Sequence, residues 1–417
     1  MPARGTLIES WLVRAARSRP EHEALRTPEG SLSYAELLAA ARCAAGGLPA
    51  GATVGLALAP GRDFVVALHA CLLSGATAVP VDLRLGAAEQ EHVTAGCDLV
   101  LDALPDGSPL EPRPQDLERP AIVVHTSGTS GLPKRVELTH GNWLWSALGA
   151  HTAMGLRPDE RWLCALPLSH VGGLSILMRS VIYATTAIVH ERFDAERVLA
   201  EDCTVISVVP TTLRRLLDAG LAGGSALRTA LVGGAPIPPA LIERAAGVGV
   251  TAMETYGLTE ACSQVTTGGR PLFCTRVELE PDGEIVVSGP TVAPGSGPRL
   301  HTGDLGVLAE DGRLALVGRK ADTIVTGGEN VAPAEVEAVL EAHPAVAEAA
   351  VHARPDPEWG EAVVATVVLR PGAQPEIVEL QAFVRARLAP FKVPKALSFA
   401  AQLPRTPSGK LLRRDLV

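Results

Sequence analysis

The residues best suited to chemistry form one nine-residue run of glycines, hydroxyl side chains and a lysine. The run follows the apolar stretch Ala121–His125, a predicted buried strand, and reads Thr126-Ser127-Gly128-Thr129-Ser130-Gly131-Leu132-Pro133-Lys134. Glycines let backbone amides approach an anion, hydroxyls donate to phosphate oxygens and the lysine adds positive charge. It is not a Walker A loop, because Arg135 follows the lysine. The run therefore predicts a phosphate-binding loop, with a plain surface loop as the alternative.

Four further polar motifs follow this loop along the chain. They are Tyr256-Gly257-Leu258-Thr259-Glu260, Thr302-Gly303-Asp304-Leu305, Gly318-Arg319-Lys320-Ala321-Asp322 with Gly327-Gly328-Glu329-Asn330, and Pro404-Arg405-Thr406-Pro407-Ser408-Gly409-Lys410. Together with the loop, and in the same order, they resemble the signature motifs of adenylate-forming enzymes. That family comprises acyl- and aryl-CoA ligases, adenylation domains and luciferases. The resemblance covers most of the chain.

The resemblance implies a two-step reaction that uses ATP, Mg²⁺ and coenzyme A. A carboxylate first attacks the α-phosphorus of ATP and displaces pyrophosphate, and a thiol then attacks the acyl-adenylate. Because two anions repel, catalysis of the first step depends on positioning and charge neutralisation. By resemblance, Thr259 donates to the α-phosphate and Glu260 holds Mg²⁺, for which one protein carboxylate is enough. Lys410 bridges the carboxylate and the phosphate as a mobile point charge.

The resemblance also assigns the rest of the nucleotide site. Asp304 accepts hydrogen bonds from both ribose hydroxyls, and Arg319 supports the ribose. Tyr256 and Gly257 lie on one side of the adenine, and Gly234-Ala235-Pro236 on the other. The implied phosphate contacts come from the loop, namely Thr126, Ser127, Gly128, Thr129, Ser130, Gly131 and Lys134.

For the second step, the family rotates its small domain about a hinge that maps onto Lys320. This rotation removes Lys410 and brings Thr326, Gly327 and Gly328 to the reaction centre. Glycines suit a path on which a long thiol arm passes close to the backbone. A plain turn between two strands is the alternative for this loop.

The acid site is expected around His170, which we place among the catalytic residues and at the edge of the acyl pocket. Gly172 and Arg179 follow it, and Arg179 interrupts an apolar run, where a guanidinium needs an anionic partner. The segments 174–194 and 205–209 resemble 2-succinylbenzoate–CoA ligases of menaquinone biosynthesis, whose dicarboxylic substrate keeps one free carboxylate for such an arginine. The alternatives are an ion pair of Arg179 with a neighbouring Asp or Glu, and a merely packed His170 ring.

Four features depart from the family pattern. Arg135 replaces the glycine that usually follows the loop lysine, and Gly172 stands where some succinylbenzoate ligases have a serine. The N-terminal part and the segment 266–275 are shorter than in typical relatives. These departures concern the choice of acid rather than the reaction class.

Alternating strand and helix patterns must position these residues. The apolar runs 121–125, 205–209 and 229–232 predict strands. Thr211 and Thr212 are expected to cap a helix, and Leu7 to Leu12 to begin a first amphipathic one. We expect an α/β fold: a large N-terminal domain of layered, mostly parallel sheets with helices (1–319), and a small mobile α+β domain (320–417). Ligands then lie at the carboxyl ends of strands.

Composition narrows the class further. Lys and Arg total 37 against 46 Asp and Glu, so the net charge of −9 disfavours nucleic-acid binding. The seven scattered cysteines form no CxxC pair, which indicates neither a zinc site nor a disulfide framework. No uncharged apolar run reaches about 18 residues, so no membrane span is expected. We expect a cytoplasmic protein whose partners are a carboxylic acid, ATP and coenzyme A, with a homodimer as a possible assembly.

Other functions remain open at this stage. The chain could activate another aryl or medium-chain acid, or be an inactive nucleotide-binding scaffold, although Thr259, Glu260, Asp304 and Lys410 argue against inactivity. An amino-acid-activating domain is disfavoured, because no Asp follows His170 where a partner for an α-amine would be expected.

Overall fold

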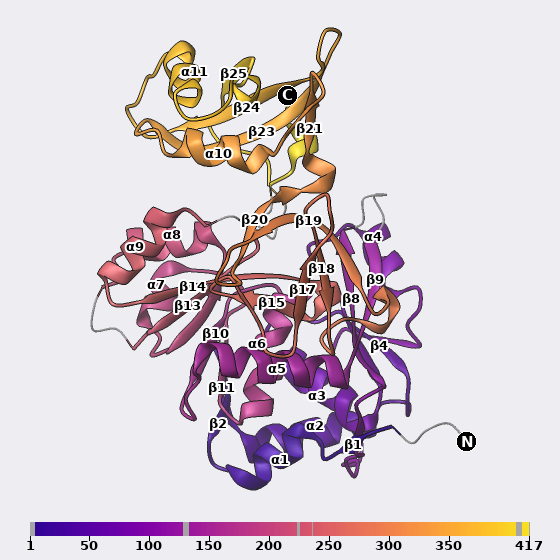
Figure 1. Cartoon of the computed structure of the whole chain (residues 1–417). Helices are drawn as coiled ribbons and strands as arrows, with labels where there is room; N and C mark the ends of the chain where they lie inside the picture. Colours follow the sequence, from indigo (N-terminus) through magenta and orange to yellow (C-terminus); the bar gives the residue numbers. More distant parts are fainter. Residues whose placement is uncertain (1–4, 128–132, 223–225, 236, 406–410, 417) are drawn as a thin grey trace. The chain divides into compact units, whose positions relative to one another are not determined.

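The chain folds into two compact units (Figure 1). The first comprises Met1–Val277 and Val287–Leu300, and the second comprises Glu278–Val286 and His301–Val417. The computed structural model describes residues 5–127, 133–222, 226–235, 237–405 and 411–416. The domain boundary expected at residue 320 stays a prediction.

The first unit is built on two large mixed sheets. The nine-stranded sheet has the order β16 (Arg270–Pro271), β15 (Ser263–Thr267), β14 (Thr251–Leu258), β13 (Thr229–Val232), β12 (Val205–Val208), β10 (Arg161–Cys164), β11 (Thr186–Val189), β2 (Glu23–Thr27) and β3 (Gly30–Ser33). The five-stranded sheet has the order β6 (Leu99–Leu101), β4 (Thr53–Leu56), β5 (Thr77–Pro80), β8 (Pro120–Ser127) and β9 (Pro133–Thr139). The central strands of both sheets run parallel. A short pair, β1 (Leu7–Ile8) with β7 (Gln115–Asp116), is antiparallel.

Helices cover both faces of the nine-stranded sheet, because its buried strands are apolar on both sides. One face packs against α7 (Ala195–Ala200), α8 (Pro210–Asp218) and α9 (Pro239–Gly247). The other face shares a large core with the five-stranded sheet, to which α1 (Trp11–Ser18), α2 (Tyr34–Gly46), α3 (Arg62–Ser74), α5 (His140–Met154) and α6 (Val171–Tyr183) contribute. Helix α4 (Ala87–Thr94) packs on the outer face of the five-stranded sheet through Val93.

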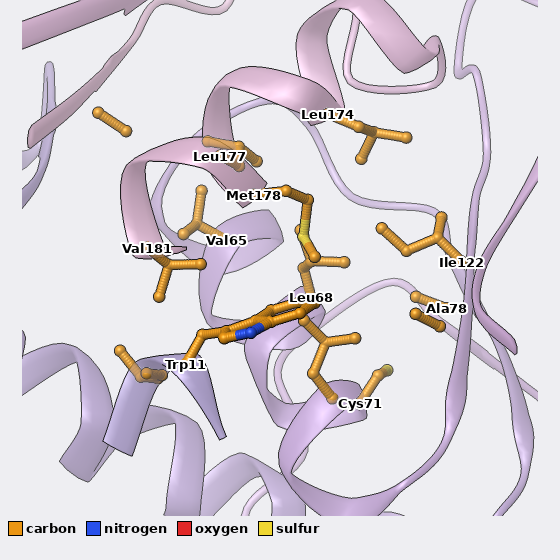
Figure 2. Packing of buried hydrophobic residues seen from close by; sticks show 14 of the residues in the cluster. Trp11, Val65, Leu68, Cys71, Ala78, Ile122, Leu174, Leu177, Met178 and Val181 are labelled. Atoms are coloured by element: carbon orange, nitrogen blue, oxygen red, sulfur yellow. The ribbon is translucent and has the colours of Figure 1, made fainter. Parts of the chain in front are cut away.

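Helix α6 is buried from Gly173 to Ile182. Figure 2 shows its apolar side chains packed around Trp11 and α3, with spacing typical of one helix face: Leu174, Leu177, Met178 and Val181. Because a helix surrounded by core has no solvent-facing side, its one charged residue, Arg179, is held inside the protein.

The second unit contains most of a four-stranded sheet and a small α+β body. The four-stranded order is β17 (Arg276–Leu279), β18 (Glu284–Ser288), β19 (Leu300–Leu308) and β20 (Leu314–Arg319). The α+β body has the strands β21 (Ile324–Thr326), β22 (Glu329–Val331), β23 (Val346–Asp356), β24 (Gly360–Leu369) and β25 (Ala396–Phe399). Helices α10 (Pro333–Glu341) and α11 (Ile377–Arg385) bury Val336, Leu340, Leu380 and Val384 in its core.

The expected α/β class is confirmed, and the predicted strands correspond to β8, β12 and β13. Two local predictions are wrong. Helix α8 begins at Pro210, so Thr211 and Thr212 lie inside its first turn, because a proline at the first helical position starts a helix without a side-chain cap. Leu7 and Ile8 form β1, and the first helix begins only at Trp11. Within the described part of the chain, no helix combines the length and apolar character needed to cross a membrane.

Candidate active site

The predicted phosphate loop joins two antiparallel strands, β8 and β9. Thr126 pairs with Lys134 across the hairpin, and the Thr126 hydroxyl donates to the Lys134 carbonyl at 3.5 Å. The connecting residues Gly128, Thr129, Ser130 and Gly131 lie outside the described residues. Because β8 lies parallel to β5, the hairpin leaves the sheet at its carboxyl edge, where ligands of α/β sheets bind.

The structure brings the loop lysine beside the carboxylate predicted to hold magnesium. Lys134 Nζ lies 3.6 Å from Glu260 Oε1, with the lysine side chain largely exposed and the glutamate largely buried. A pair with one exposed member contributes only about 0–1 kcal/mol of stability. Breaking this pair therefore costs little free energy, which leaves Lys134 available to phosphate and Glu260 available to magnesium when the nucleotide binds.

Thr259 and Glu260 begin a short 3-10 turn, η1 (Thr259–Ala261), directly after β14. The hairpin from β14 to β15 is tight, because a Cβ at Gly257 would lie 1.6 Å from the Ser263 carbonyl oxygen. Only glycine permits this approach. Cys262 and Ser263 complete the reversal with positive φ angles of 52° and 87°. The glycine of this motif thus fixes where Thr259 and Glu260 leave the strand.

The loop after β13 lies against β14. A Cβ at Gly233 would meet the Thr255 side chain at 2.7 Å, so the glycine lets this loop contact the strand that carries Tyr256. Gly234, with φ of 79°, and Ala235 are exposed, whereas Pro236 lies outside the described residues. Tyr256 is only 8% exposed. Its role beside the adenine stays a prediction.

A magnesium ion fits this donor set if it arrives with the nucleotide. Among the described residues no group of three or more His, Cys, Asp or Glu side chains could hold a metal ion by itself. Magnesium usually takes one or two protein carboxylates and completes its octahedron with phosphate oxygens and water. One carboxylate, Glu260, beside the lysine of a phosphate loop matches that need.

In the second unit, Asp304 and Arg319 form a cross-strand ion pair. They face each other in register on β19 and β20, and Arg319 Nε lies 3.0 Å from Asp304 Oδ1. The Asp304 side chain is about one-tenth exposed, whereas that of Arg319 is half exposed. The arginine therefore fixes the orientation of the carboxylate, and the role of Asp304 beside the ribose stays a prediction.

Lys320 and the glycine loop also lie in the second unit. Lys320 Nζ is 2.6 Å from Asp282 and 3.1 Å from Glu284, and these carboxylates raise its pKa. Gly327 and Gly328, with φ of 60° and 84°, form the two-residue turn between β21 and β22. A Cβ at Gly327 would lie 2.7 Å from the Trp359 ring. Thr326 precedes this turn and is buried.

His170 and Gly172 lie at the start of α6. His170 is the residue before the helix, and its side chain makes no cap hydrogen bond. Burial lowers the pKa of its imidazole, an effect that the charge of Asp82 partly opposes. A Cβ at Gly172 would make only ordinary contact with Leu166, at 3.4 Å, so a serine here would fit the space.

Arg179 lies inside the core of the first unit, 1% exposed. Its Nη2 donates to the Ser146 hydroxyl at 3.3 Å, and its guanidinium lies 5.6 Å from the Trp162 ring centroid. Within the described residues, Nε and Nη1 have no hydrogen-bond partner and no carboxylate pairs with this arginine. Burial accordingly lowers its pKa. The alternative of an ion pair with a neighbouring Asp or Glu is therefore not what this part of the structure shows.

The domain content of the chain matches one enzyme family. Residues 12–101 and 98–296 match the sequence model of the AMP-binding enzymes, and residues 335–410 match that of the AMP-binding enzyme C-terminal domain. The chain belongs to the AMP-binding enzyme family.

Two similar members of the AMP-binding enzyme family carry the same name. The 2-succinylbenzoate–CoA ligase of Bacillus licheniformis is 36% identical, and the alignment covers 98% of this chain and 99% of that protein. That of Bacillus subtilis is 34% identical over 98% and 97%. The resemblance drawn from the motifs is confirmed.

Solved structures of the Bacillus subtilis o-succinylbenzoate coenzyme A synthetase are similar throughout. Its complex with the acyl-adenylate intermediate has a TM-score of 0.90 at 34% identity and covers 98% of both chains. Its complex with ATP and a magnesium ion has a TM-score of 0.91 at 34% identity, covering 99% of this chain and 100% of that one.

For this AMP-binding enzyme, the first unit brings together Thr126, Lys134, Thr259 and Glu260, and separately His170 and Gly172. Lys410 lies outside the described residues, as does most of the phosphate loop. Sequence reasoning missed Ser146 and Trp162, whose hydroxyl and ring contact Arg179, and Ser207, whose Oγ accepts a hydrogen bond from Trp162 Nε1 at 3.0 Å. The one sequence feature that could have indicated these residues is a polar side-chain atom within an otherwise apolar, buried segment.

Proposed function

We propose that this chain is an ATP-dependent 2-succinylbenzoate–CoA ligase acting in menaquinone biosynthesis. It forms an acyl-adenylate and pyrophosphate, then a coenzyme A thioester and AMP. The observation that carries the choice of acid is Arg179, a buried guanidinium with no carboxylate partner among the described residues. A dicarboxylic acid supplies that partner with the carboxylate that is not activated.

The first step depends on charge neutralisation around the α-phosphate. The phosphate loop and Lys134 bind the phosphates, Thr259 donates to the α-phosphate, and Asp304, oriented by Arg319, binds the ribose hydroxyls. Glu260 would hold magnesium, which neutralises phosphate charge when bound. Lys410 bridges the attacking carboxylate and the phosphate, while His170 borders the acyl group.

The second step transfers the acyl group to the thiol of coenzyme A. The thiol sulfur bonds to the acyl carbon, the bond from that carbon to the AMP oxygen breaks, and the thiol proton is lost to solvent. Lys320 serves as the hinge, and Thr326, Gly327 and Gly328 line the path of the thiol arm. The bare backbone of the two glycines at positive φ favours that path.

Glu260→Gln tests the magnesium assignment. The amide keeps the shape but loses the charge, so we expect pyrophosphate release to fall about 100-fold, with half-maximal rate reached only at higher Mg²⁺. The matched control is Glu137→Gln on β9, which removes an exposed carboxylate paired with Arg135 at 2.9 Å. An unchanged Mg²⁺ titration in Glu260→Gln would remove this carboxylate from the metal site.

The function itself is tested by pyrophosphate release with a panel of acids, with and without coenzyme A. We expect 2-succinylbenzoate to be preferred over benzoate and medium-chain acids, and thioester to form only with coenzyme A. A preference for another acid would replace the substrate but keep the reaction class. ATP binding without pyrophosphate release would indicate a nucleotide-binding scaffold.

A further inference from the structure

The carboxylate of Asp82 is the centre of a hydrogen-bond cluster that the reaction scheme does not use. The Arg84 backbone N–H and Nε donate to Oδ1 at 3.1 and 2.8 Å, and Arg84 Nη2 donates to Oδ2 at 2.5 Å. The Ser169 hydroxyl donates to the same Oδ2 at 3.0 Å. The Asp82 side chain is mostly buried, so these groups rather than water satisfy most of its hydrogen-bonding capacity.

This cluster joins the two large sheets of the first unit. Asp82 lies in the loop after β5 of the five-stranded sheet, and Ser169 lies in the loop after β10 of the nine-stranded sheet. The bond between them links residues 87 positions apart. Both loops leave the carboxyl ends of parallel strands, where the ligands of such sheets bind. A single carboxylate therefore ties the edge of one sheet to that of the other.

The Ser169 side of the cluster is a tight turn that starts α6. The His170 backbone N–H donates to the Pro167 carbonyl at 3.2 Å, and a Cβ at Gly173 would lie 2.5 Å from that same oxygen. Ser169 thus lies in a turn that is hydrogen-bonded within itself and packed against the first turn of α6. Helix α6, which begins one residue after His170, also carries Arg179. The position of this turn therefore sets the place of His170 and the start of the helix that carries Gly172 and Arg179.

Asp82 remains ionised in this position. Burial opposes its charge, but hydrogen bonds from Arg84 and Ser169 outweigh burial and lower its pKa to about 2. Hydrogen bonds to an ionised acceptor are shorter and stronger than those between neutral groups. The Ser169 hydroxyl therefore donates to a charged acceptor, at 3.0 Å.

We propose that Asp82, held in place by Arg84, is a positioning residue that fixes the turn Pro167–His170 through Ser169 and thereby sets the acid-binding geometry. The inference rests on the proposed function, in which His170 and Arg179 face the acid. Asp82 acts through Ser169 and does not touch the substrate.

The test compares Ser169→Ala, Asp82→Ala and the double variant in steady-state kinetics. Loss of a hydrogen bond to a charged group corresponds to about a tenfold change. We expect each single variant to raise the KM for the acid about tenfold with the KM for ATP unchanged. The double variant should be no worse than the singles, because both remove the same contact. Ser169→Thr, which keeps the hydroxyl, should restore the KM.

The matched control is Ser31→Ala, which removes another serine-to-carboxylate bond of the first unit, from Ser31 Oγ to Glu23 at 2.6 Å. It should leave both KM values unchanged. Equal rises in the KM for acid and ATP, additive effects, or an unchanged KM in Ser169→Ala would overturn the proposal. If Asp82→Ala does not fold, the Ser169→Ala and Ser169→Thr pair decides. The acid used is the best one in the panel for the unaltered chain, so a wrong substrate and a wrong positioning role fail separately.

Discussion

Replacing Lys410 by alanine should nearly abolish adenylate formation and leave the second half-reaction nearly intact. In the first step a carboxylate approaches a phosphate, and one mobile ammonium group bridges the two anions. Loss of one such preorganised electrostatic contact lowers a rate about 100- to 1000-fold. In the second step a thiol attacks the acyl carbon of the mixed anhydride, so no carboxylate has to approach a phosphate and this bridging charge is not needed.

The two half-reactions can be measured separately. Pyrophosphate release with ATP and acid reports the first, and thioester formation from a chemically prepared acyl-adenylate reports the second. The control is Lys392→Ala, a lysine of the same unit whose ammonium lies 2.6 Å from Glu335. It should affect neither step beyond a small loss of stability. Equal losses in both half-reactions of Lys410→Ala would contradict its assignment to the first.

The motifs were predictable because their chemistry is local. The phosphate loop, the Tyr256–Glu260 motif and the glycine turn at 327–328 each need particular residue types within a few positions, so the pattern survives in the sequence. Likewise, alternating apolar runs indicated β8, β12 and β13, since buried parallel strands are apolar on both faces. The start of α8 was misplaced because a proline replaced the expected side-chain cap.

Long-range partnerships could not be predicted in this way. The hydrogen bond between Ser169 and Asp82 joins residues 87 positions apart, and no local sequence pattern at either residue indicates the other as its partner. For Arg179 the sequence indicated that a partner was needed and favoured a substrate carboxylate, but it left an internal carboxylate open as the alternative. Packing bears on the internal alternative: α6 is buried from Gly173 to Ile182, and within the described residues the guanidinium contacts one hydroxyl and one aromatic ring.

Because Arg179 is buried, Arg179→Met should change both the stability of the protein and its KM for the dicarboxylic acid. A buried charge without a counter-ion costs folding free energy, so methionine should stabilise the free protein by about 1–4 kcal/mol. The lost hydrogen bond to Ser146 and the contact with Trp162 offset part of this gain. At the same time, the KM for 2-succinylbenzoate should rise about 100-fold, because its second carboxylate loses a desolvated partner. The KM for ATP should not change.

The control is the same substitution at an arginine that does have a carboxylate partner. Arg228 pairs with Glu160, which is 2% exposed, so Arg228→Met leaves a buried carboxylate unpaired and should destabilise the protein by about 3–5 kcal/mol. The two arginine-to-methionine changes are thus expected to shift the midpoint of thermal unfolding in opposite directions.

A monocarboxylic acid completes the argument about Arg179. Benzoate lacks the second carboxylate, so its KM should be equally poor in the unaltered chain and in Arg179→Met, whereas the KM for 2-succinylbenzoate should separate the two. Stability gained together with selective loss of the dicarboxylate means that the protein keeps an unfavourable charge in its core for its substrate. Stability lost with the KM unchanged would mean that the arginine is satisfied within the fold, and the choice of a dicarboxylic acid would then lose its physical basis.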